Sequence, residues 1–267
     1  MSLRSTGRAL PTLVRIGLAE AVAYRGEMLV WMLSTTMPLV MLALFSAVAR
    51  DGPIGGFGQA DLAAYFLATF VVRQFTSAWA AWEINYEVRT GSLAMRLLRP
   101  LSPVACWAVE NLAAMPLRLV VVIPVAAIAL VTVGATPFAH GWGNAALFVL
   151  SLAGAWLLTF LVHVAIGTLS LWLEQSLKVL DVWFAGYLVL SGYLVPVAFF
   201  PPALRETMRW LPFRYQIGLP VEILLGEHGR AETLSLLGVQ FAWIAVAAIA
   251  TAAIWRRGLR RFAAYGG

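Results

Sequence analysis

The chain contains few side chains that could carry out catalysis or hold a metal ion. Its single cysteine, Cys106, excludes a disulfide within the chain, and its three histidines lie far apart in the sequence, so we predict no metal site. An intramembrane hydrolase would need a positioned nucleophile and base. The candidates for those roles are Ser191, followed by Gly192, and His163, and they lack a flanking glycine turn and an orienting acid. The sequence therefore predicts no catalytic residue.

Hydrolysis of ATP by this chain is not predicted either. A phosphate-binding loop needs a glycine-rich turn that ends in a lysine and a hydroxyl residue. The only lysine, Lys178, lies in EQSLKVLDV, and the glycine-rich stretch GPIGGFG at 52–58 contains no lysine. We therefore expect the chain itself to bind no cofactor.

Three charged or polar side chains lie inside long apolar stretches. Arg73 lies near the middle of 62–83, where a charge costs roughly 2.5–3.5 kcal/mol and must face protein or water. We predict that Arg73 contacts an anionic headgroup or a water-filled path, or else makes structural hydrogen bonds. Arg118 can reach the membrane surface or pair with Glu110. His163 lies deep in its stretch and is predicted to line a pathway or to make a helix contact.

The segment EVRTGSLAMRLLRPLSP, residues 87–103, is short, basic and amphipathic. On a helix, the apolar side chains of Leu93, Ala94, Leu97, Leu98 and Leu101 fill one arc, and those of Arg89, Arg96 and Arg99 fill the next. Ser92 can cap this helix, and Pro100 and Pro103 end or kink it. Such a helix is too short to span a membrane. It is predicted either to lie on anionic lipid or to dock into a groove on a soluble partner.

Prolines punctuate the chain after residue 200, at Pro201, Pro202, Pro212 and Pro220. The first two are expected to end the helix before them, and 201–226 should form short broken helices. Such backbone is tolerated in a membrane only where protein or a water-filled cavity satisfies it. Trp210, Phe213 and Tyr215 suit an interfacial depth. We predict that 201–230 caps the outer end of a transport pathway, and the alternative is a surface loop without a gating role.

These residues must be positioned by membrane-spanning helices. The 267-residue chain is 61% hydrophobic and only 12% charged, which exceeds what a water-soluble fold can bury. Because a span needs about 20 mainly apolar residues, the sequence predicts six, at about 28–49, 62–83, 113–134, 143–173, 180–200 and 233–255. We predict an all-α polytopic membrane protein with a single transmembrane domain over 1–267.

The first residues of the chain do not resemble a signal peptide. Arg15 and Glu20 interrupt their apolar part, and no small-residue cleavage site follows. On a helix over about 8–25, one side is apolar and carries Leu10, Leu13, Val14, Leu18 and Val22. This pattern predicts an interfacial helix that leads into the first span. A flexible basic tail is the alternative.

The distribution of arginine predicts the orientation of the chain. Basic loops resist translocation, and an even number of spans with both termini in the cytoplasm places most of the basic residues inside. The net charge of +6 is therefore interpreted as this bias and not as a nucleic-acid surface.

Three stretches are similar to one known family. They are a span that ends in WEINYEVRTGSLAMRLLRPLSP, the segment VPVAFFPPALRETMRWLPFRYQIGLPVEILLGE at 195–227, and the closing WRRGLRRFAAYGG. In this order they resemble the permease subunits of type-2 ABC exporters, in the branch with separate ATPases and often two different permeases. The likeness covers nearly the whole chain in the order of its elements, although each motif by itself is loose.

The resemblance implies a bacterial inner-membrane permease that exports cargo by alternating access. It implies three kinds of partner: a cytoplasmic ABC ATPase dimer that binds ATP and Mg²⁺, a second permease that is identical or related, and membrane lipid. The residues that match the family's ATPase-coupling helix are Arg89, Gly91, Leu93, Leu97, Leu98, Arg99 and Pro100. An external gate would use Pro201, Pro202, Trp210, Pro212 and Tyr215, and the pathway would use Arg73 and His163. An amphipathic drug, an antibiotic, an organic cation or a lipid-linked molecule would fit as cargo in multidrug efflux.

An ion-coupled secondary transporter is the alternative function. Such proteins usually carry acidic residues inside their spans, or paired broken helices from an internal repeat. The deep parts of the predicted spans lack Asp and Glu, and the two halves show no repeat. The sequence therefore favours the ATP-driven exporter.

Overall fold

The computed structural model describes residues 3–23, 26, 30, 35–134, 138 and 140–262. Within these residues the regular elements are helices, joined by turns, with one isolated bridge between Ile54 and Phe57. The α-helices are α1 (Leu3–Ala23), α3 (Met37–Val48), α4 (Gln59–Thr76), α5 (Ala80–Thr90), α6 (Leu93–Leu97), α7 (Pro103–Ala113), α8 (Met115–Thr132), α9 (Gly141–Thr168), α10 (Ser176–Leu190), α11 (Pro202–Arg209), α12 (Gly218–Leu224) and α13 (Arg230–Arg261). Short 3-10 helices lie at Ala49–Asp51, Leu169–Leu171, Val197–Phe199 and Arg214–Gln216. The predicted all-helical class is confirmed.

Three helical stretches are long and apolar enough to cross a membrane. They are Pro103–Thr132, which joins α7 to α8, Gly141–Leu171, which contains α9, and Arg230–Arg261, which is α13. They correspond to the predicted third, fourth and sixth spans. The third begins earlier than predicted, because Pro103 starts a helix instead of only ending the preceding one.

The predicted second span is interrupted. Helix α4 ends at Thr76 and α5 begins at Ala80, with Ser77 in an extended conformation. Helices α7 and α8 supply partners on both sides of this break. Arg118 of α8 donates to the carbonyls of Gln74 and Ser77 and to the Ser77 hydroxyl, and Asn111 of α7 accepts from the backbone N–H of Trp79 at 3.0 Å.

The interaction at the end of α4 has a clear physical reason. The last carbonyls of a helix lack partners within the helix, and a cation is stabilised near them by the helix dipole. Arg118 is 3% exposed and provides both the donors and the charge. Its partners are thus the end of α4, and the predicted pairing of Arg118 with Glu110 is wrong because Glu110 pairs with Arg96.

The predicted fifth span is shorter than expected. Helix α10 ends at Leu190, and Gly192 follows with a φ of +85°, a conformation that favours glycine. The Tyr65 hydroxyl donates to the Gly192 carbonyl at 2.7 Å. The prediction that Pro201 and Pro202 end this helix is therefore wrong, since Pro202 instead occupies the first turn of α11, where a missing N–H costs nothing.

The remaining predicted elements agree in part. Helix α3 lies inside the predicted first span, of which residues 28, 29 and 31–34 fall outside the described residues. Helix α1 covers most of the predicted interfacial helix and packs on α7, where a Cβ on Gly17 would come within 2.8 Å of the Ala113 Cβ. Helices α11 and α12 and the 3-10 turn between them confirm that the chain after residue 200 forms short broken helices.

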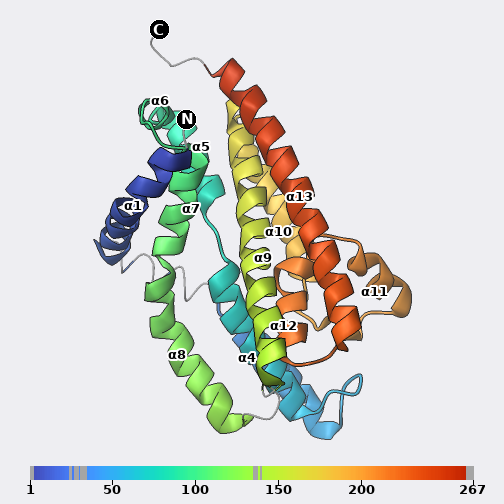
Figure 1. Cartoon of the computed structure of the whole chain (residues 1–267). Helices are drawn as coiled ribbons and strands as arrows, with labels where there is room; N and C mark the ends of the chain where they lie inside the picture. Colours follow the sequence, from blue (N-terminus) through green and yellow to red (C-terminus); the bar gives the residue numbers. More distant parts are fainter. Residues whose placement is uncertain are drawn as a thin grey trace.

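Helix α9 lies at the centre of the fold and packs against α13, α5, α12 and α4. Small residues allow this close approach, as is usual between membrane helices: a Cβ on Gly167 would come within 3.0 Å of the Ala81 Cα on α5. Helix α6 and the C-terminal end of α13 lie at one end of the molecule, and the end of α8 and the start of α9 lie at the other (Figure 1).

Candidate functional site

The segment predicted to couple to a partner folds as a sharp turn followed by one short helix. Gly91 ends α5 with a φ of +75°, which is the left-handed conformation that glycine adopts at helix C-termini. Helix α6 then covers only Leu93–Leu97. The regular helix begins directly after Ser92, the predicted cap, and is much shorter than the predicted coupling segment, residues 87–101.

The predicted leucine arc is divided between the core and the surface. Leu93 is fully buried against Ile84 and Trp107, and Leu97 packs on the same cluster. Leu98, by contrast, is 78% exposed and Met95 is 65% exposed.

Exposed residues in this segment and directly before it include Tyr86, Arg89, Met95, Leu98, Arg99 and Pro100, and we call these six residues the α6 face. It combines apolar side chains with two arginines. Of the residues matched to a coupling helix, the structure therefore exposes Arg89, Leu98, Arg99 and Pro100, and it buries Leu93.

Arg96 anchors α6 from the inside. Its guanidinium lies 2.5 Å from Glu87, 2.9 Å from Glu110 and 3.3 Å from Glu83, and it stacks over the ring of Trp107. The side chain of Arg96 is only 14% exposed, so the prediction that Arg96 shares a surface arc with Arg89 and Arg99 is wrong. The ion pairs with Glu87 and Glu110 and the hydrogen bond to Glu83 outweigh the preference of an isolated arginine for water.

This arginine–glutamate cluster (Arg96, Glu83, Glu87 and Glu110) was missed by sequence reasoning. Burial raises the pKa of Glu87, although Arg96 beside it acts in the opposite direction. Glu83 and Glu87 are spaced i, i+4 and thus share one face of α5, which is the signal in the sequence that could have suggested a common partner. Their common partner, Arg96, lies on α6, and the third carboxylate, Glu110, lies on α7, so the pattern within α5 does not predict either of them.

Arg73 and His163 belong to a second cluster, inside the helical bundle. The Arg73 guanidinium lies 5.2 Å from the ring centre of Tyr187 and 5.9 Å from that of Tyr193. His163, which is 3% exposed, lies edge-on to Trp82 and to Phe184. The ring of Phe184 also contacts Tyr187, so aromatic rings connect the two predicted pathway residues.

The residues predicted to form an external gate occupy different environments. Pro201 and Pro202 are exposed at the start of α11, and Trp210 is 61% exposed. Pro212 is buried, and Tyr215 is fully buried in a cluster with Leu158 and Leu236. The Tyr215 hydroxyl donates to the Arg209 carbonyl.

A network of charged side chains fixes the end of this segment, and sequence reasoning did not find it. Arg214 binds Glu222 through two hydrogen bonds, at 2.8 and 3.2 Å, and His228 lies 2.9 Å from the same carboxylate. Burial alone would raise the pKa of Glu222, but the hydrogen bonds from His228 and Arg214 lower it below its ordinary value. The hydrogen bond to Glu222 in turn raises the pKa of His228. These three side chains join the 3-10 turn to α12 and to the loop before α13.

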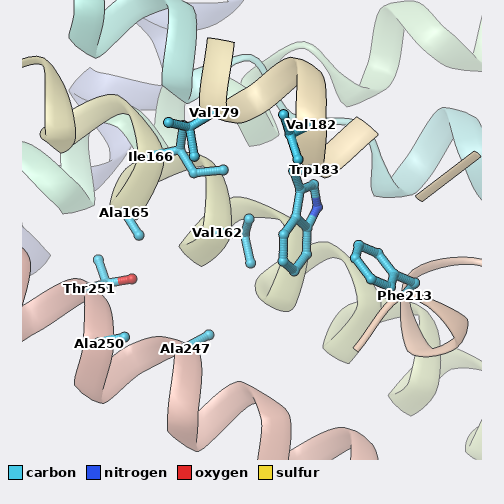
Figure 2. A pocket seen from close by; sticks show the side chains of 10 residues that line it. All are labelled: Val162, Ala165, Ile166, Val179, Val182, Trp183, Phe213, Ala247, Ala250 and Thr251. Carbon is cyan, nitrogen blue, oxygen red and sulfur yellow. The ribbon is translucent and has the colours of Figure 1, made fainter. Parts of the chain in front are cut away.

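An apolar groove of about 350 Å³ lies between α9, α10 and α13. Figure 2 shows Val162, Val182 and Trp183 along it, with Phe213 at one end and Thr251 on α13. The rings of Trp183 and Phe213 are 4.6 Å apart. This groove can accommodate an apolar molecule or part of one, and it offers no cluster of charged side chains.

No group of three or more metal-ligating side chains occurs in the part of the chain that the structure describes. The described residues thus contain an exposed face on α6, a cluster of aromatic rings around Arg73 and an apolar groove.

A family model described as ABC-2 family transporter protein matches residues 32–266, which is most of the chain. No curated protein was found to be similar to it.

Proposed function

This chain belongs to the ABC-2 family of transporter proteins, and we propose that it is the permease subunit of an ATP-driven exporter in the bacterial inner membrane. It forms half of a translocation pathway. A second permease, identical or related, forms the other half. A separate cytoplasmic ABC ATPase dimer binds ATP and Mg²⁺ and supplies the energy.

The observation that carries this proposal is the construction of the α6 face. Exposed apolar side chains next to arginines, at the tip of a short helix, suit a groove on a soluble partner. The arginine–glutamate cluster and the burial of Leu93 hold this face rigidly against α5 and α7. A force applied to α6 by a closing ATPase is therefore transmitted to the helices and is not lost in a flexible loop.

The arrangement of the chain supports an orientation with both termini in the cytoplasm. Helix α6 and the basic C-terminal end of α13 lie at the same end of the molecule (Figure 1). The exposed arginines at that end include Arg89, Arg99, Arg256 and Arg257. Basic residues at one end of a membrane bundle favour a cytoplasmic location for that end.

The cargo in this proposal is amphipathic. The apolar groove between α9, α10 and α13 accommodates an apolar part (Figure 2). A drug, an antibiotic, an organic cation or a lipid-linked molecule each contains such a part. Alternating access would carry it across as the two permeases rock against each other.

The test is the substitution Leu98→Glu. A buried carboxylate without a partner is expensive, so this substitution should weaken binding of the ATPase at least about tenfold if Leu98 enters a groove. The tagged chain is purified in mild detergent, a co-purified ABC ATPase is identified by its phosphate-binding loop, and both its amount and its rate of ATP hydrolysis are measured. The matched control is Leu204→Glu, because Leu204 is an exposed leucine of α11, away from α6.

We expect Leu204→Glu to retain the ATPase and Leu98→Glu to lose it. Equal retention by both variants would show that the ATPase does not bind through α6. If the protein were an ion-coupled secondary transporter, no ATPase and no ATP hydrolysis would co-purify with the parent chain or with either variant.

A further inference from the structure

Arg73 is a charge without a counter-charge among the described residues. The ion pairs there involve Arg96, Lys178, Arg214 and His228, and none involves Arg73. Its Nε is buried without a hydrogen-bond partner, although the side chain as a whole is partly exposed. Arg73 thus differs from Arg96, which has three carboxylates, and from Arg118, which has the end of α4.

The neighbours of Arg73 also have unused hydrogen-bonding capacity. Tyr187, which is 3% exposed, holds its ring under the Arg73 guanidinium, and its buried hydroxyl has no hydrogen-bond partner apart from Arg73. His163, farther along the same series of rings, has a buried Nδ1 without a partner. A buried polar group to which nothing binds is unfavourable for the folded chain.

The kind of group that satisfies this site follows from its donors. A guanidinium offers a planar fork of N–H groups that matches an oxyanion, and a tyrosine hydroxyl offers one more donor. A carboxylate has two oxygens, which the guanidinium alone can engage, whereas a phosphate has a further oxygen for Tyr187. The surrounding rings of Phe184, Trp82 and Tyr193 favour an apolar portion next to the charge.

We propose that Arg73 and Tyr187 bind the phosphate group of an amphipathic molecule between α4 and α10, with its apolar part against the neighbouring aromatic rings. Two molecules carry this chemistry: the headgroup of a phospholipid, and a single-chain phosphate amphiphile transported as cargo. If the ligand is transported cargo, the site rests on the proposed function and identifies the class of its substrate. Binding to the site is measured without any ATPase. Failure here would therefore leave the coupling result at α6 unaffected.

The experiment measures binding to the purified full-length chain in a neutral detergent. Dodecyl phosphate is titrated against intrinsic tryptophan fluorescence, and dodecyltrimethylammonium serves as the cationic counterpart of equal chain length. In a second arm, native mass spectrometry counts the phosphatidylglycerol and phosphatidylcholine molecules that remain bound. The variants are Arg73→Gln, Arg73→Lys and Tyr187→Phe, and the matched control is Arg205→Gln, because Arg205 is an exposed arginine of α11.

We expect the parent chain and Arg205→Gln to bind dodecyl phosphate equally and in preference to the cation. Arg73→Gln should bind it at least about tenfold more weakly, since a charge-assisted pair is lost. The affinity of Arg73→Lys for dodecyl phosphate should lie between those of the parent and Arg73→Gln. An ammonium group keeps the positive charge but lacks the planar fork of N–H donors. Retention of phosphatidylglycerol alone would identify a lipid headgroup as the ligand, and binding of dodecyl phosphate would identify a single-chain amphiphile.

The proposal would be overturned if Arg73→Gln bound both anionic probes as tightly as the parent does. It would also be overturned if the parent bound dodecyltrimethylammonium as tightly as dodecyl phosphate. If Arg73→Gln does not fold, Tyr187→Phe decides the question. The loss of its hydroxyl should weaken phosphate binding several-fold, and an unchanged affinity would equally overturn the assignment.

Discussion

Three arginines of this chain show how one residue type serves different purposes. Arg96 is surrounded by carboxylates, Arg118 donates to backbone carbonyls at the end of α4, and Arg73 lies over two tyrosine rings. The sequence predicted that Arg73 faces protein or water, and that Arg118 either reaches the membrane surface or pairs with Glu110. It could not predict their partners, since these come from helices that are remote in sequence.

His228 gives a prediction at the residue scale about pH. Arg214, Glu222 and Glu232 lie against its ring, and its pKa is raised, chiefly by the hydrogen bond to Glu222. A histidine whose pKa is raised on folding stabilises the fold fully below its ordinary pKa of about 6.5, and this stability is lost as the pH rises through the raised pKa. The midpoint temperature of thermal unfolding in detergent should therefore decrease as the pH is raised from 6 to 9.

The control for this pH dependence is His228→Asn, which should unfold with a flatter profile and lower stability at pH 6. Glu222, whose pKa is lowered, stabilises the fold above its ordinary pKa and loses this effect only as the pH falls through the lowered value. Glu227, whose pKa burial raises to about 7, contributes to the decline just above pH 6 as well, so the part assigned to His228 is the difference between the two profiles. A His228→Asn profile that declines as steeply as that of the parent would contradict this assignment.

Helices break in this chain for reasons of two kinds. After α5 and α10, glycines with positive φ end the helix, and such breaks leave a signal in the sequence. Between α4 and α5 the residues Ser77, Ala78 and Trp79 include neither glycine nor proline. That break depends on Arg118 and Asn111, and for this reason hydrophobic pattern alone predicted one unbroken span over 62–83.

Gly167 gives a prediction about how the elements pack. A Cβ on this residue would meet the Ala81 Cα and the Ile84 Cβ at 3.0 Å, and backbone at this distance cannot move aside without cost. Gly167→Ala should destabilise the fold by about 1–3 kcal/mol, measured as a lower midpoint of thermal unfolding. Gly238→Ala on α13 is the matched control, since nothing lies within 4 Å of its added Cβ.

In the control, alanine should be neutral or stabilising by up to about 1 kcal/mol, because it has the higher helix propensity. If both variants unfold at the same temperature, the close contact between α9 and α5 does not contribute to stability.

At the scale of the whole molecule, composition predicted the class and hydrophobic length predicted the long helices. The stretches Gly141–Leu171 and Arg230–Arg261 agree closely with two of the predicted spans. The six-span count stays a prediction, because α3, α4 and α10 are shorter than the three stretches that meet the length and hydropathy of a span. The segment that carries the α6 face could be located from the sequence, but which of its side chains are exposed and which anchor it required the tertiary structure.

Orientation is the prediction that belongs to this scale. Arg205→Cys in α11 should react with a membrane-impermeant maleimide from outside the cell, and Arg257→Cys in α13 should react only after the membrane is opened. Both positions are exposed, and the native Cys106 is only 2% exposed, so background labelling should be low. The reverse pattern would place the C-terminus outside and exclude α6 from contact with a cytoplasmic ATPase.

The break between α4 and α5 has a mechanical consequence. A rod pushed at one end moves as a whole, whereas a jointed rod turns about its joint. Helix α5 carries α6 at its far end. At its near end the backbone N–H of Trp79 donates to Asn111 of α7, whereas Arg118 of α8 holds the end of α4. We expect α5 to act as a short lever that turns about Asn111, so that a push on α6 tilts α7, while α8 stays attached through Arg118 to α4 and Arg73.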